Sequence, residues 1–249
     1  MLPRMTDSAP KVKTMTAASP VKAYRDLAYG GMPLWKVLWA EFLYFFVGPL
    51  PGALGLALRK ILYPSLFRSC GRGVIFGRNL LLRHPHKIDL GPKVVLDDNV
   101  TLDAKGATNH GITLGERVYI GRGSSLYTKN GDMALGDNVS VSANAILFSS
   151  NSLTVGKNTV IASFAYLLSG GEYDPQDPTP FAFQPGTCTK GPLVVGEDCW
   201  IGTGVKVLDA AQGIGPRAVV AAGAVVTKPL AGNATYAGVP ARPLPAKKA

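Results

Sequence analysis

The sequence contains little cysteine and little histidine, and these shortages exclude several classes of protein. Its 249 residues include three cysteines, Cys70, Cys188 and Cys199, and three histidines. An odd number of cysteines without a CxxC spacing predicts neither a disulfide framework nor a zinc finger, so we expect free thiols in a reducing compartment. The first 30 residues are polar and basic, without a short apolar core and a cleavage site, so no secretory signal is expected.

The charge is unbalanced, with few acidic side chains. Lysine and arginine number 26 against 16 aspartate and glutamate, which gives a net charge of +10. Such a chain favours anionic partners: phosphates, acidic lipids or nucleic acid. Nucleic-acid binding is not expected, because the basic residues are dispersed and no aromatic stacking platform is evident. With 47% hydrophobic residues and 29 glycines, the chain has enough apolar material for a sizeable core in a turn-rich β architecture.

Composition divides the chain into three regions. Residues 1–20 are polar and aperiodic, which predicts a disordered basic tail. Residues 21–73 form an apolar, aromatic segment, and residues 74–245 carry an internal repeat.

The apolar segment is too short to span a bilayer. Residues 42–58 carry no charge, but 17 residues fall short of the roughly 20 that a spanning helix needs. Proline and glycine at 48–52 interrupt the run, so we predict two short helices, at about 33–47 and 52–63. The many tryptophan, tyrosine and phenylalanine side chains with flanking cations favour a segment lying in one leaflet. The alternative is a soluble pair of helices that caps the repeat region.

The repeat is an aliphatic residue that returns every six positions, in groups of three. The groups are Leu90, Leu96, Leu102; Leu114, Ile120, Leu126; Leu135, Val141, Leu147; Val155, Ile161, Leu167; Val195, Ile201, Val207; and Ile214, Val220, Val226. Every irregular step follows the third member of a group, and these steps are 12, 9, 8, 28 and 7 residues long. Eighteen residues therefore close one coil with three sides, and all insertions leave one corner.

The pattern predicts a three-sided parallel β-helix of about six or seven coils. Strands stack at roughly 4.8 Å, so seven coils make a prism about 34 Å tall that buries its apolar faces only as a stack. Phe76, Leu82 and Ile88 are the candidates for one further coil at the start, in a poor register. Glycines that follow the aliphatic residues, and pairs such as Asp137-Asn138, suit tight turns between the sides.

The last third of the repeat region carries an ordered series of motifs. These are VGEDCWIG at 195–202, TGVKVL at 203–208, GIGPRAVVAAGAVVTK at 213–228 and AGVPAR at 237–242. In order and spacing the series resembles the carboxy-terminal signature of the bacterial hexapeptide-repeat acyltransferases. It resembles most their branch of sugar and xenobiotic O-acetyltransferases, over about residues 74–245.

The resemblance implies properties that spacing alone does not. The β-helix would be left-handed, the protein a homotrimer, and acetyl-CoA would lie in a groove between neighbouring prisms. Arg217 and Lys228 would offset the phosphate charge of the cofactor. The residues expected to bind acetyl-CoA are Trp200, Gly202, Arg217, Ala222, Gly223, Lys228 and Arg242.

The similar O-acetyltransferases place a histidine base on a long loop, in a sequence like GGxH. The matching loop here is 168–192, and it reads Tyr173 at that position, preceded by Glu172. A phenol with a pKa near 10 is a poor base at neutral pH. Three hypotheses remain: Glu172 acts as the base, His110 in a turn at the same corner acts instead, or the chain has lost this chemistry. Glu172, Tyr173 and His110 are the candidate catalytic residues.

The other histidines are not expected to take part in chemistry. His84 and His86 are expected on the surface of the first coil. No set of three histidines has the spacing with which related prism-shaped carbonic anhydrases hold zinc, so no metal site is predicted.

The leading functional hypothesis is a CoA-dependent O-acetyltransferase that modifies a sugar hydroxyl. If residues 34–67 associate with a membrane, the acceptor is a saccharide precursor at the cytoplasmic membrane face. The alternative is a catalytically silent β-helix, a membrane-associated scaffold or a binder of nucleotide sugars.

Overall fold

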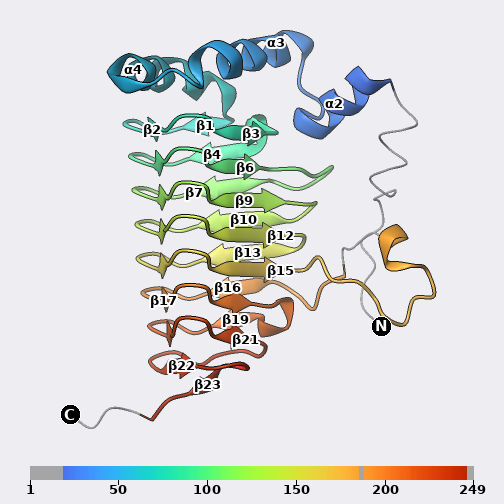
Figure 1. Cartoon of the computed structure of the whole chain (residues 1–249), viewed down its shortest axis with the longest axis vertical. Coiled ribbons are helices and arrows are strands. Elements are labelled where there is room, and N and C mark those ends of the chain that lie inside the picture. Colours follow the sequence, from blue (N-terminus) through green and yellow to red (C-terminus); the bar gives the residue numbers. More distant parts are fainter. Residues whose placement is uncertain (1–18, 185–187, 246–249) are drawn as a thin grey trace.

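The computed structural model describes residues 19–184 and 188–245. The predicted disordered tail, residues 1–20, lies almost entirely outside the described residues. The chain forms a tall prism of stacked coils with helices lying across one end (Figure 1).

Three parallel sheets form the three sides of the prism, here named sheets A, B and C. Sheet A contains β1 (Ser69–Cys70), β4 (Ile88–Leu90), β7 (Ile112–Leu114), β10 (Asp132–Leu135), β13 (Ser152–Val155), β16 (Leu193–Val195) and β19 (Gly213–Ile214). Sheet B contains β2 (Ile75–Phe76), β5 (Val95–Leu96), β8 (Tyr119–Ile120), β11 (Ser140–Val141), β14 (Val160–Ile161), β17 (Trp200–Ile201), β20 (Val219–Val220), β22 (Thr235–Ala237) and β23 (Arg242–Pro243). Sheet C contains β3 (Leu81–Arg83), β6 (Thr101–Asp103), β9 (Ser125–Thr128), β12 (Ile146–Ser149), β15 (Tyr166–Ser169), β18 (Lys206–Val207) and β21 (Val225–Val226).

Successive coils stack in register, so the repeated aliphatic residues form columns inside the prism. On sheet A, Leu90 aligns with Leu114, and Leu135 aligns with Val155. These side chains are at most 3% exposed. Burying one such side chain stabilises the fold by roughly 1.5–3 kcal/mol, and the contribution accumulates along the stack. The predicted three-sided parallel β-helix is therefore confirmed.

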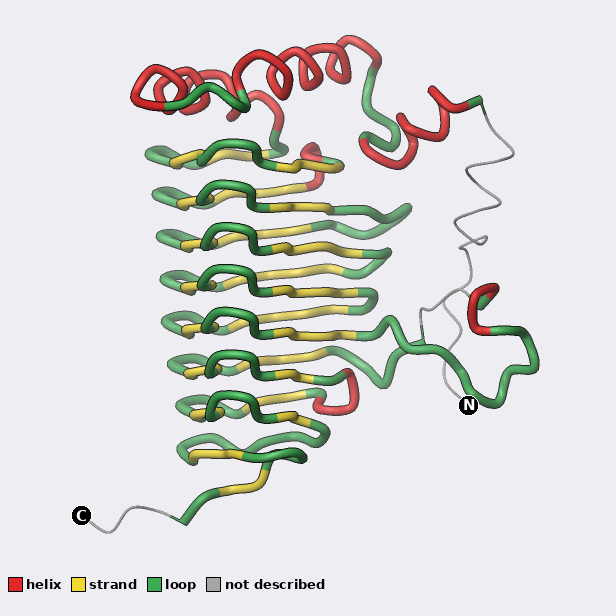
Figure 2. Tube along the Cα trace, in the orientation of Figure 1, coloured by secondary structure: helices red, strands yellow, loops and turns green. Residues whose placement is uncertain are grey.

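The insertions leave the prism at a single corner, as predicted. This loop corner, where the chain passes from sheet C back to sheet A, consists of residues 84–87, 104–111, 129–131, 150–151, 170–192 and 208–212. Figure 2 shows these connections projecting on one side of the prism, the longest of them far beyond the others.

The first coil is more regular than the sequence predicted. Its inward residues are Phe76 and Leu82, both buried, and β3 aligns Leu82 with Leu102. The step from Leu82 to Leu90 is an insertion at the loop corner, with a short 3-10 helix, η3 (Pro85–Lys87). The expected third member, Ile88, instead opens β4 of the next coil. The repeat thus begins at β1 and gives seven complete coils, with a partial eighth at β22.

Glycines after the aliphatic residues serve close stacking, not the turn conformation that the sequence suggested. A Cβ on Gly91 would lie 2.5 Å from the backbone of Gly115 in the next coil. The left-handed conformation falls later in the turn, on residues such as Asn138 (φ 58°) and Asn158 (φ 59°). Asparagine tolerates this region, so the predicted turn role of these residues is confirmed.

In the described part of the chain, three helical stretches precede the coils. They are α2 (Pro20–Ala28), α3 (Leu34–Phe42) continued by the π-helical turn η1 (Leu43–Val47), and α4 (Gly52–Leu62) continued by the 3-10 turn η2 (Tyr63–Leu66). Two further 3-10 turns, η4 (Phe181–Phe183) and η5 (Asp209–Ala211), lie at the loop corner. The helices at 34–47 and 52–62 agree closely with those predicted, whereas α2 was not foreseen as a separate element.

The helices pack on the first coil and cover its open end. Val37, Ala40 and Leu43 are buried, and the Tyr63 ring meets the Phe76 ring edge-on, 5.5 Å between centroids. Within the described part of the chain, no helix has the length and apolar character required to cross a membrane.

Candidate active site at the loop corner

His110 lies at the loop corner in a network of charged side chains. Its Nε2 is 2.5 Å from an Arg68 guanidinium nitrogen and 3.4 Å from an Asp89 carboxylate oxygen. Arg68 also donates to the carbonyl oxygen of His110 at 2.8 Å and pairs with Asp89, to which Ser69 donates a hydrogen bond. The Arg68 guanidinium lowers the pKa of Asp89 to about 2.

This network restricts what His110 can do. A guanidinium is always a donor, so a hydrogen bond from Arg68 requires Nε2 of His110 to be the acceptor, with the proton on Nδ1. The lone pair that a general base needs is then occupied. The sequence identified His110 but gave no sign of Arg68 and Asp89, which stand 42 and 21 residues before it.

The long loop is closed at its base by a buried carboxylate that the sequence did not reveal. Asp209 is fully buried and accepts hydrogen bonds from the backbone N–H groups of Gly170 and Lys190. The Thr189 hydroxyl donates to the same carboxylate at 3.1 Å. Glu172 and Cys188 then pair through two backbone hydrogen bonds of 3.0 Å each. The two ends of the loop are therefore tied to each other and to the next coil.

Further along, the loop is organised by one glutamine. The Gln184 amide donates to the carbonyl oxygens of Asp174, Asp177 and Thr179, and its own oxygen accepts from the Asp174 N–H. Tyr173 is half exposed, and its ring meets that of Phe181 edge-on, 6.0 Å between centroids. The Tyr173 phenol is thus part of the loop's own packing.

Two aromatic rings on sheet C form a floor beneath the loop base. Phe148 and Tyr127 stack along the sheet with centroids 4.8 Å apart, and burial raises the pKa of Tyr127 to about 12. Gly171, in the left-handed region with φ 83°, passes so close that a Cβ would lie 2.4 Å from the Phe148 ring. A glycine is needed there for both reasons.

The three candidate catalytic residues share the corner but do not meet. His110 lies on the connection before β7, whereas Glu172 and Tyr173 lie on the connection before β16, three coils further along. At strand spacing this separation is about 14 Å. Among the described residues, no hydrogen bond or ring contact joins His110 to Glu172 or Tyr173.

The residues expected to bind acetyl-CoA occupy coils six to eight but different faces. Trp200 projects outward from sheet B, 58% exposed, in register with Val160 and Val219. Ala222 and Gly223 form the exposed turn between sheets B and C. The remaining cations are exposed as well: Arg217 at the corner between sheets A and B, Lys228 after β21, and Arg242 on β23.

Gly202 has a packing role that does not involve a ligand. It is buried, and a Cβ there would lie 2.6 Å from the backbone nitrogen of Ala222. Gly223 differs, because its φ is 72° and a Cβ would meet nothing within 4 Å.

The expectation that His84 and His86 lie on the surface was wrong. His84 is 4% exposed, in the left-handed region, with its Nδ1 3.3 Å from an Asp103 carboxylate oxygen. Helix α2 covers it, since the His84 N–H donates to the carbonyl oxygen of Ala28. His86 is half-buried, and burial lowers its pKa to about 4. In residues 19–184 and 188–245, no three histidine, cysteine, aspartate or glutamate side chains gather where they could hold a metal ion.

Comparison of the chain with known proteins identifies its family. No family model matches the chain. WcaF of Escherichia coli K12, named as a colanic acid biosynthesis acetyltransferase, is 33% identical over 131 residues, which are 53% of this chain and 67% of WcaF. WbbJ of the same organism, named as a lipopolysaccharide biosynthesis O-acetyl transferase, is 32% identical over 137 residues, 53% of this chain and 69% of WbbJ. The chain belongs to the bacterial hexapeptide-repeat acyltransferase family.

A solved structure agrees in fold. AntD, an N-acyltransferase from Bacillus cereus, was determined in complex with dTDP and 3-hydroxybutyryl-CoA. It matches with a TM-score of 0.52 and 22% identity, over 76% of this chain and 88% of AntD. The resemblance predicted from the motifs at 195–242 is thereby confirmed, and the chain is an acyltransferase by descent.

Proposed function

We propose that this acyltransferase moves an acetyl group from acetyl-CoA to a hydroxyl of a saccharide, with the chemistry at the loop corner. Family membership carries the proposal, because the curated relatives are named as acetyltransferases of colanic acid and lipopolysaccharide biosynthesis. The related AntD structure contains an acyl-CoA, which supports acetyl-CoA as the donor here.

The reaction needs a base at the acceptor and a place for the donor. The base takes the hydroxyl proton, the oxygen attacks the thioester carbon, and the tetrahedral intermediate collapses with loss of the CoA thiolate, which is then protonated. The products are an acetyl ester and free CoA.

Glu172 is the candidate that the geometry favours as base. Its backbone is fixed by Cys188 and, through Gly170 and Lys190, by the buried Asp209. Its carboxylate makes no hydrogen bond or ion pair with another described residue, so it is free to accept a proton. His110 is engaged by Arg68, and the Tyr173 ring packs against Phe181 within the loop.

The expected donor site spans more than one face of the prism. Trp200 and Gly223 lie on and beside sheet B, whereas Lys228 follows sheet C and Arg217 lies at the opposite edge of sheet B. In a homotrimer, a groove between neighbouring prisms would bring cations from two chains to one CoA molecule. Guanidinium and ammonium groups there would offset the charge of its phosphates.

We place the reaction at the cytoplasmic face of a membrane. The apolar helices at 34–47 and 52–62 support this location, since their outward side chains are mostly aromatic or aliphatic. In this organisation residues 21–73 form a membrane-associated segment, and residues 74–245 form the acyltransferase domain.

Thiol release from acetyl-CoA in the presence of a saccharide panel tests the function. We expect saturable turnover that falls about 10²–10⁴-fold in Glu172→Gln, the usual loss for a general base. Tyr173→Phe and His110→Gln keep most of the activity. Full turnover by Glu172→Gln would reject Glu172 as the general base but would not contradict the proposal that the protein is an acetyltransferase.

A silent β-helix is the second candidate, favoured by the absence of the family's loop histidine. In that case the protein is a membrane-associated scaffold or a binder of nucleotide sugars. Calorimetric titration separates the two: about one acetyl-CoA bound per subunit supports the enzyme, and no binding at millimolar ligand supports the scaffold.

A further inference from the structure

The helix over residues 34–47 is apolar on both faces. Its inner face buries Val37, Ala40, Leu43 and Val47 against the first coil. Its outer face exposes only large apolar side chains: Leu34, Trp35, Leu38, Phe42, Phe45 and Phe46. Phe45 is 75% exposed and Trp35 66%. A helix that is hydrophobic all round is ordinarily buried or in contact with lipid.

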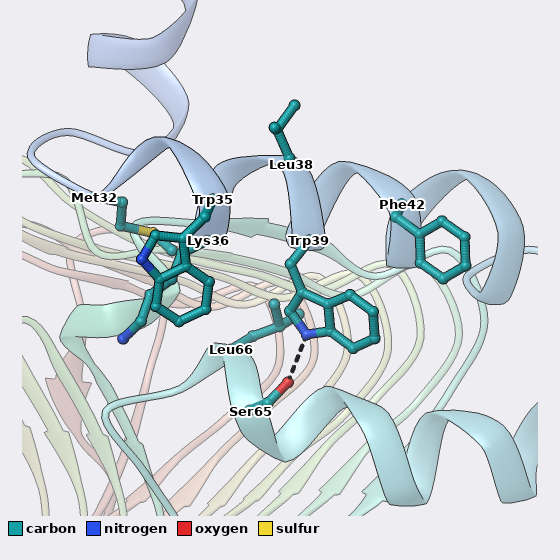
Figure 3. Close-up of a pocket in the computed structure, with 8 residues that line it drawn as sticks. All are labelled: Met32, Trp35, Lys36, Leu38, Trp39, Phe42, Ser65 and Leu66. Atoms are coloured by element: carbon teal, nitrogen blue, oxygen red, sulfur yellow. Dashed lines mark hydrogen bonds between the residues drawn. The ribbon is translucent and has the colours of Figure 1, made fainter.

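Four aromatic side chains of this helix form one continuous row. The rings of Trp39 and Phe42 stack with centroids 5.6 Å apart, Phe42 and Phe46 follow at 5.0 Å, and Phe45 meets Phe46 at 4.8 Å. Beside the row, a groove of about 690 Å³ runs between α3 and η2, lined by Trp35, Leu38 and Leu66 among others (Figure 3). An apolar patch of this extent marks an interaction surface.

Several polar groups in the helical cap are paired within the protein, whereas the buried Tyr63 hydroxyl and the Arg25 Nε have no partner among the described residues. Arg59 is 3% exposed, and its guanidinium donates to the carbonyl oxygens of Val47, Gly48 and Leu50, at and just after the end of the 34–47 helix. It also donates to the carbonyl oxygen of Phe76 in the first coil. Arg59 thus supplies donors to carbonyls at the end of the 34–47 helix, where the Gly48 carbonyl also accepts from the Asn79 N–H. An apolar phase has no water to supply, so internal satisfaction is the condition for entering it.

Further polar side chains of the cap are also paired within the protein. The Trp39 indole N–H donates to the Ser65 hydroxyl at 2.9 Å, and that hydroxyl donates to the Leu62 carbonyl. Glu41 accepts from the phenols of Tyr24 and Tyr29 at 2.6 and 2.8 Å.

The charged side chains of the helical segment favour an anionic lipid surface as the partner. Residues 20–67 contain five basic and two acidic side chains, and the outer face of the 34–47 helix has no acidic residue. Lys36 lies on this helix, with its ammonium 5.5 Å from the centre of the Trp35 ring. Aromatic side chains with cations at the rim suit the boundary of an anionic lipid leaflet.

We infer that the outer face of the 34–47 helix, with the exposed Leu54 and Ile61 of α4, docks into an anionic lipid leaflet and holds the prism upright on it. The helices are about 21 and 16 Å long at 1.5 Å per residue, too short to cross roughly 30 Å of hydrocarbon. Both lie across the end of the prism, with the coils extending away from them (Figure 1). Docking through this face therefore directs the prism axis along the membrane normal.

An upright prism sets the height of the loop corner, a consequence that rests on the proposed function. Four strand spacings separate β3 from β15, and a helix layer adds its own thickness, so Glu172 stands roughly 30 Å from the lipid. The acceptor hydroxyl would then belong to a sugar far from any lipid anchor, within a longer saccharide.

Flotation of the full chain with lipid vesicles tests the docking. We expect flotation with phosphatidylcholine vesicles containing phosphatidylglycerol, and weaker flotation without the anionic lipid. Phe45→Ser and Phe46→Ser should each lower partitioning on the order of tenfold, since each removes a large exposed apolar side chain that enters the lipid on docking. Phe164→Ser, at an equally exposed phenylalanine of the prism, is the control and should float normally. Equal flotation of all variants, or none of the wild type, would overturn the inference.

The three tryptophans test the orientation. Trp35 and Trp39 belong to the cap, and Trp200 to the sixth coil. With brominated lipids, Trp200→Phe protein should show quenched emission, and Trp35→Phe/Trp39→Phe protein should not. Quenching of Trp200 would mean that the prism lies on its side. A change of oligomeric state in Phe45→Ser, with no effect on vesicle binding, would assign the face to a second copy of the chain instead.

Acceptor length separates failure of this inference from failure of the proposed function. On vesicles, a long lipid-linked saccharide should be acetylated, and a lipid-linked monosaccharide should not, although the free sugar is accepted in solution. Equal use of both lipid-linked acceptors would overturn the upright orientation alone. The absence of turnover with every acceptor, free sugars included, would instead reject the proposed function.

Discussion

Asp209 offers a direct test of how the loop is held over the candidate site. Its carboxylate is fully buried and receives two backbone N–H groups, from Gly170 and Lys190, and the Thr189 hydroxyl. Asp209→Asn replaces one carboxylate oxygen with an NH₂ group, which cannot accept. One of the two backbone N–H groups is then left facing a donor.

The expected cost follows from these contacts. The substitution removes a charge-assisted hydrogen bond, about 1.5–3 kcal/mol, and leaves a buried N–H without a partner, about 1–3 kcal/mol. A total of about 2.5–6 kcal/mol falls on closure of the loop and little of it on the stacked coils. A penalty of 3 kcal/mol raises the open population roughly a hundredfold.

Hydrogen exchange measures this opening residue by residue. The amides of Glu172 and Cys188 are bonded to each other across the loop base, so their exchange rates report on closure. We expect both rates to rise by about two orders of magnitude in Asp209→Asn, with acetyl transfer falling in parallel. Asp198→Asn makes the same change of charge at an exposed corner and should leave both amides protected. Unchanged exchange in Asp209→Asn would refute the idea that this carboxylate closes the loop.

Three further predictions concern the rest of the chain. Gly91→Ala places a Cβ 2.5 Å from the next coil and should lower the thermal midpoint by at least about 5 °C, whereas Gly31→Ala, with nothing within 4 Å, should not. The pKa of Asp89 is lowered by Arg68 to about 2 from 3.8, so the pair contributes stability above about pH 4 that is lost as the pH falls to 2; Asp89→Asn should flatten that part of a melting-versus-pH curve. Arg59→Leu removes the buried side-chain donor from the carbonyls of Val47, Gly48 and Leu50 and should release the helical cap to proteolysis while the coils keep their β circular dichroism.

The stacking repeat could be read from the sequence because it depends on local spacing. A step of six between Leu114, Ile120 and Leu126 is sufficient to place three side chains on three inner faces. The register of the first coil was harder to predict from the sequence. Its position on sheet A, aligned with Leu90, is Cys70 instead of an aliphatic residue, and an insertion follows Leu82.

The candidate site was only partly predictable. The loop, its glycine pair and the departure at Tyr173 are visible in the sequence, since they lie next to one another in the chain. Asp209 is not, because nothing in its neighbours indicates that a carboxylate 39 residues after Gly170 will meet the Gly170 N–H. The same holds for Arg68, whose partner His110 is 42 residues away.

The sequence by itself determined the three-sided coil, the single corner for insertions, the family and the two short apolar helices. These follow from periodicity and from chain-adjacent motifs, which act over a few residues. Tertiary structure alone decided that Arg68 forms a hydrogen bond with Nε2 of His110 and that Asp209 closes the base of the loop. It also decided that the residues expected to bind CoA lie on separate faces of the prism. Tertiary structure likewise decided that the buried Arg59 side chain donates to the carbonyl oxygens at the end of the 34–47 helix. Hydrogen bonds and charge pairing depend on positions in space to within an ångström, and stacking the coils brings together residues that the linear order keeps apart.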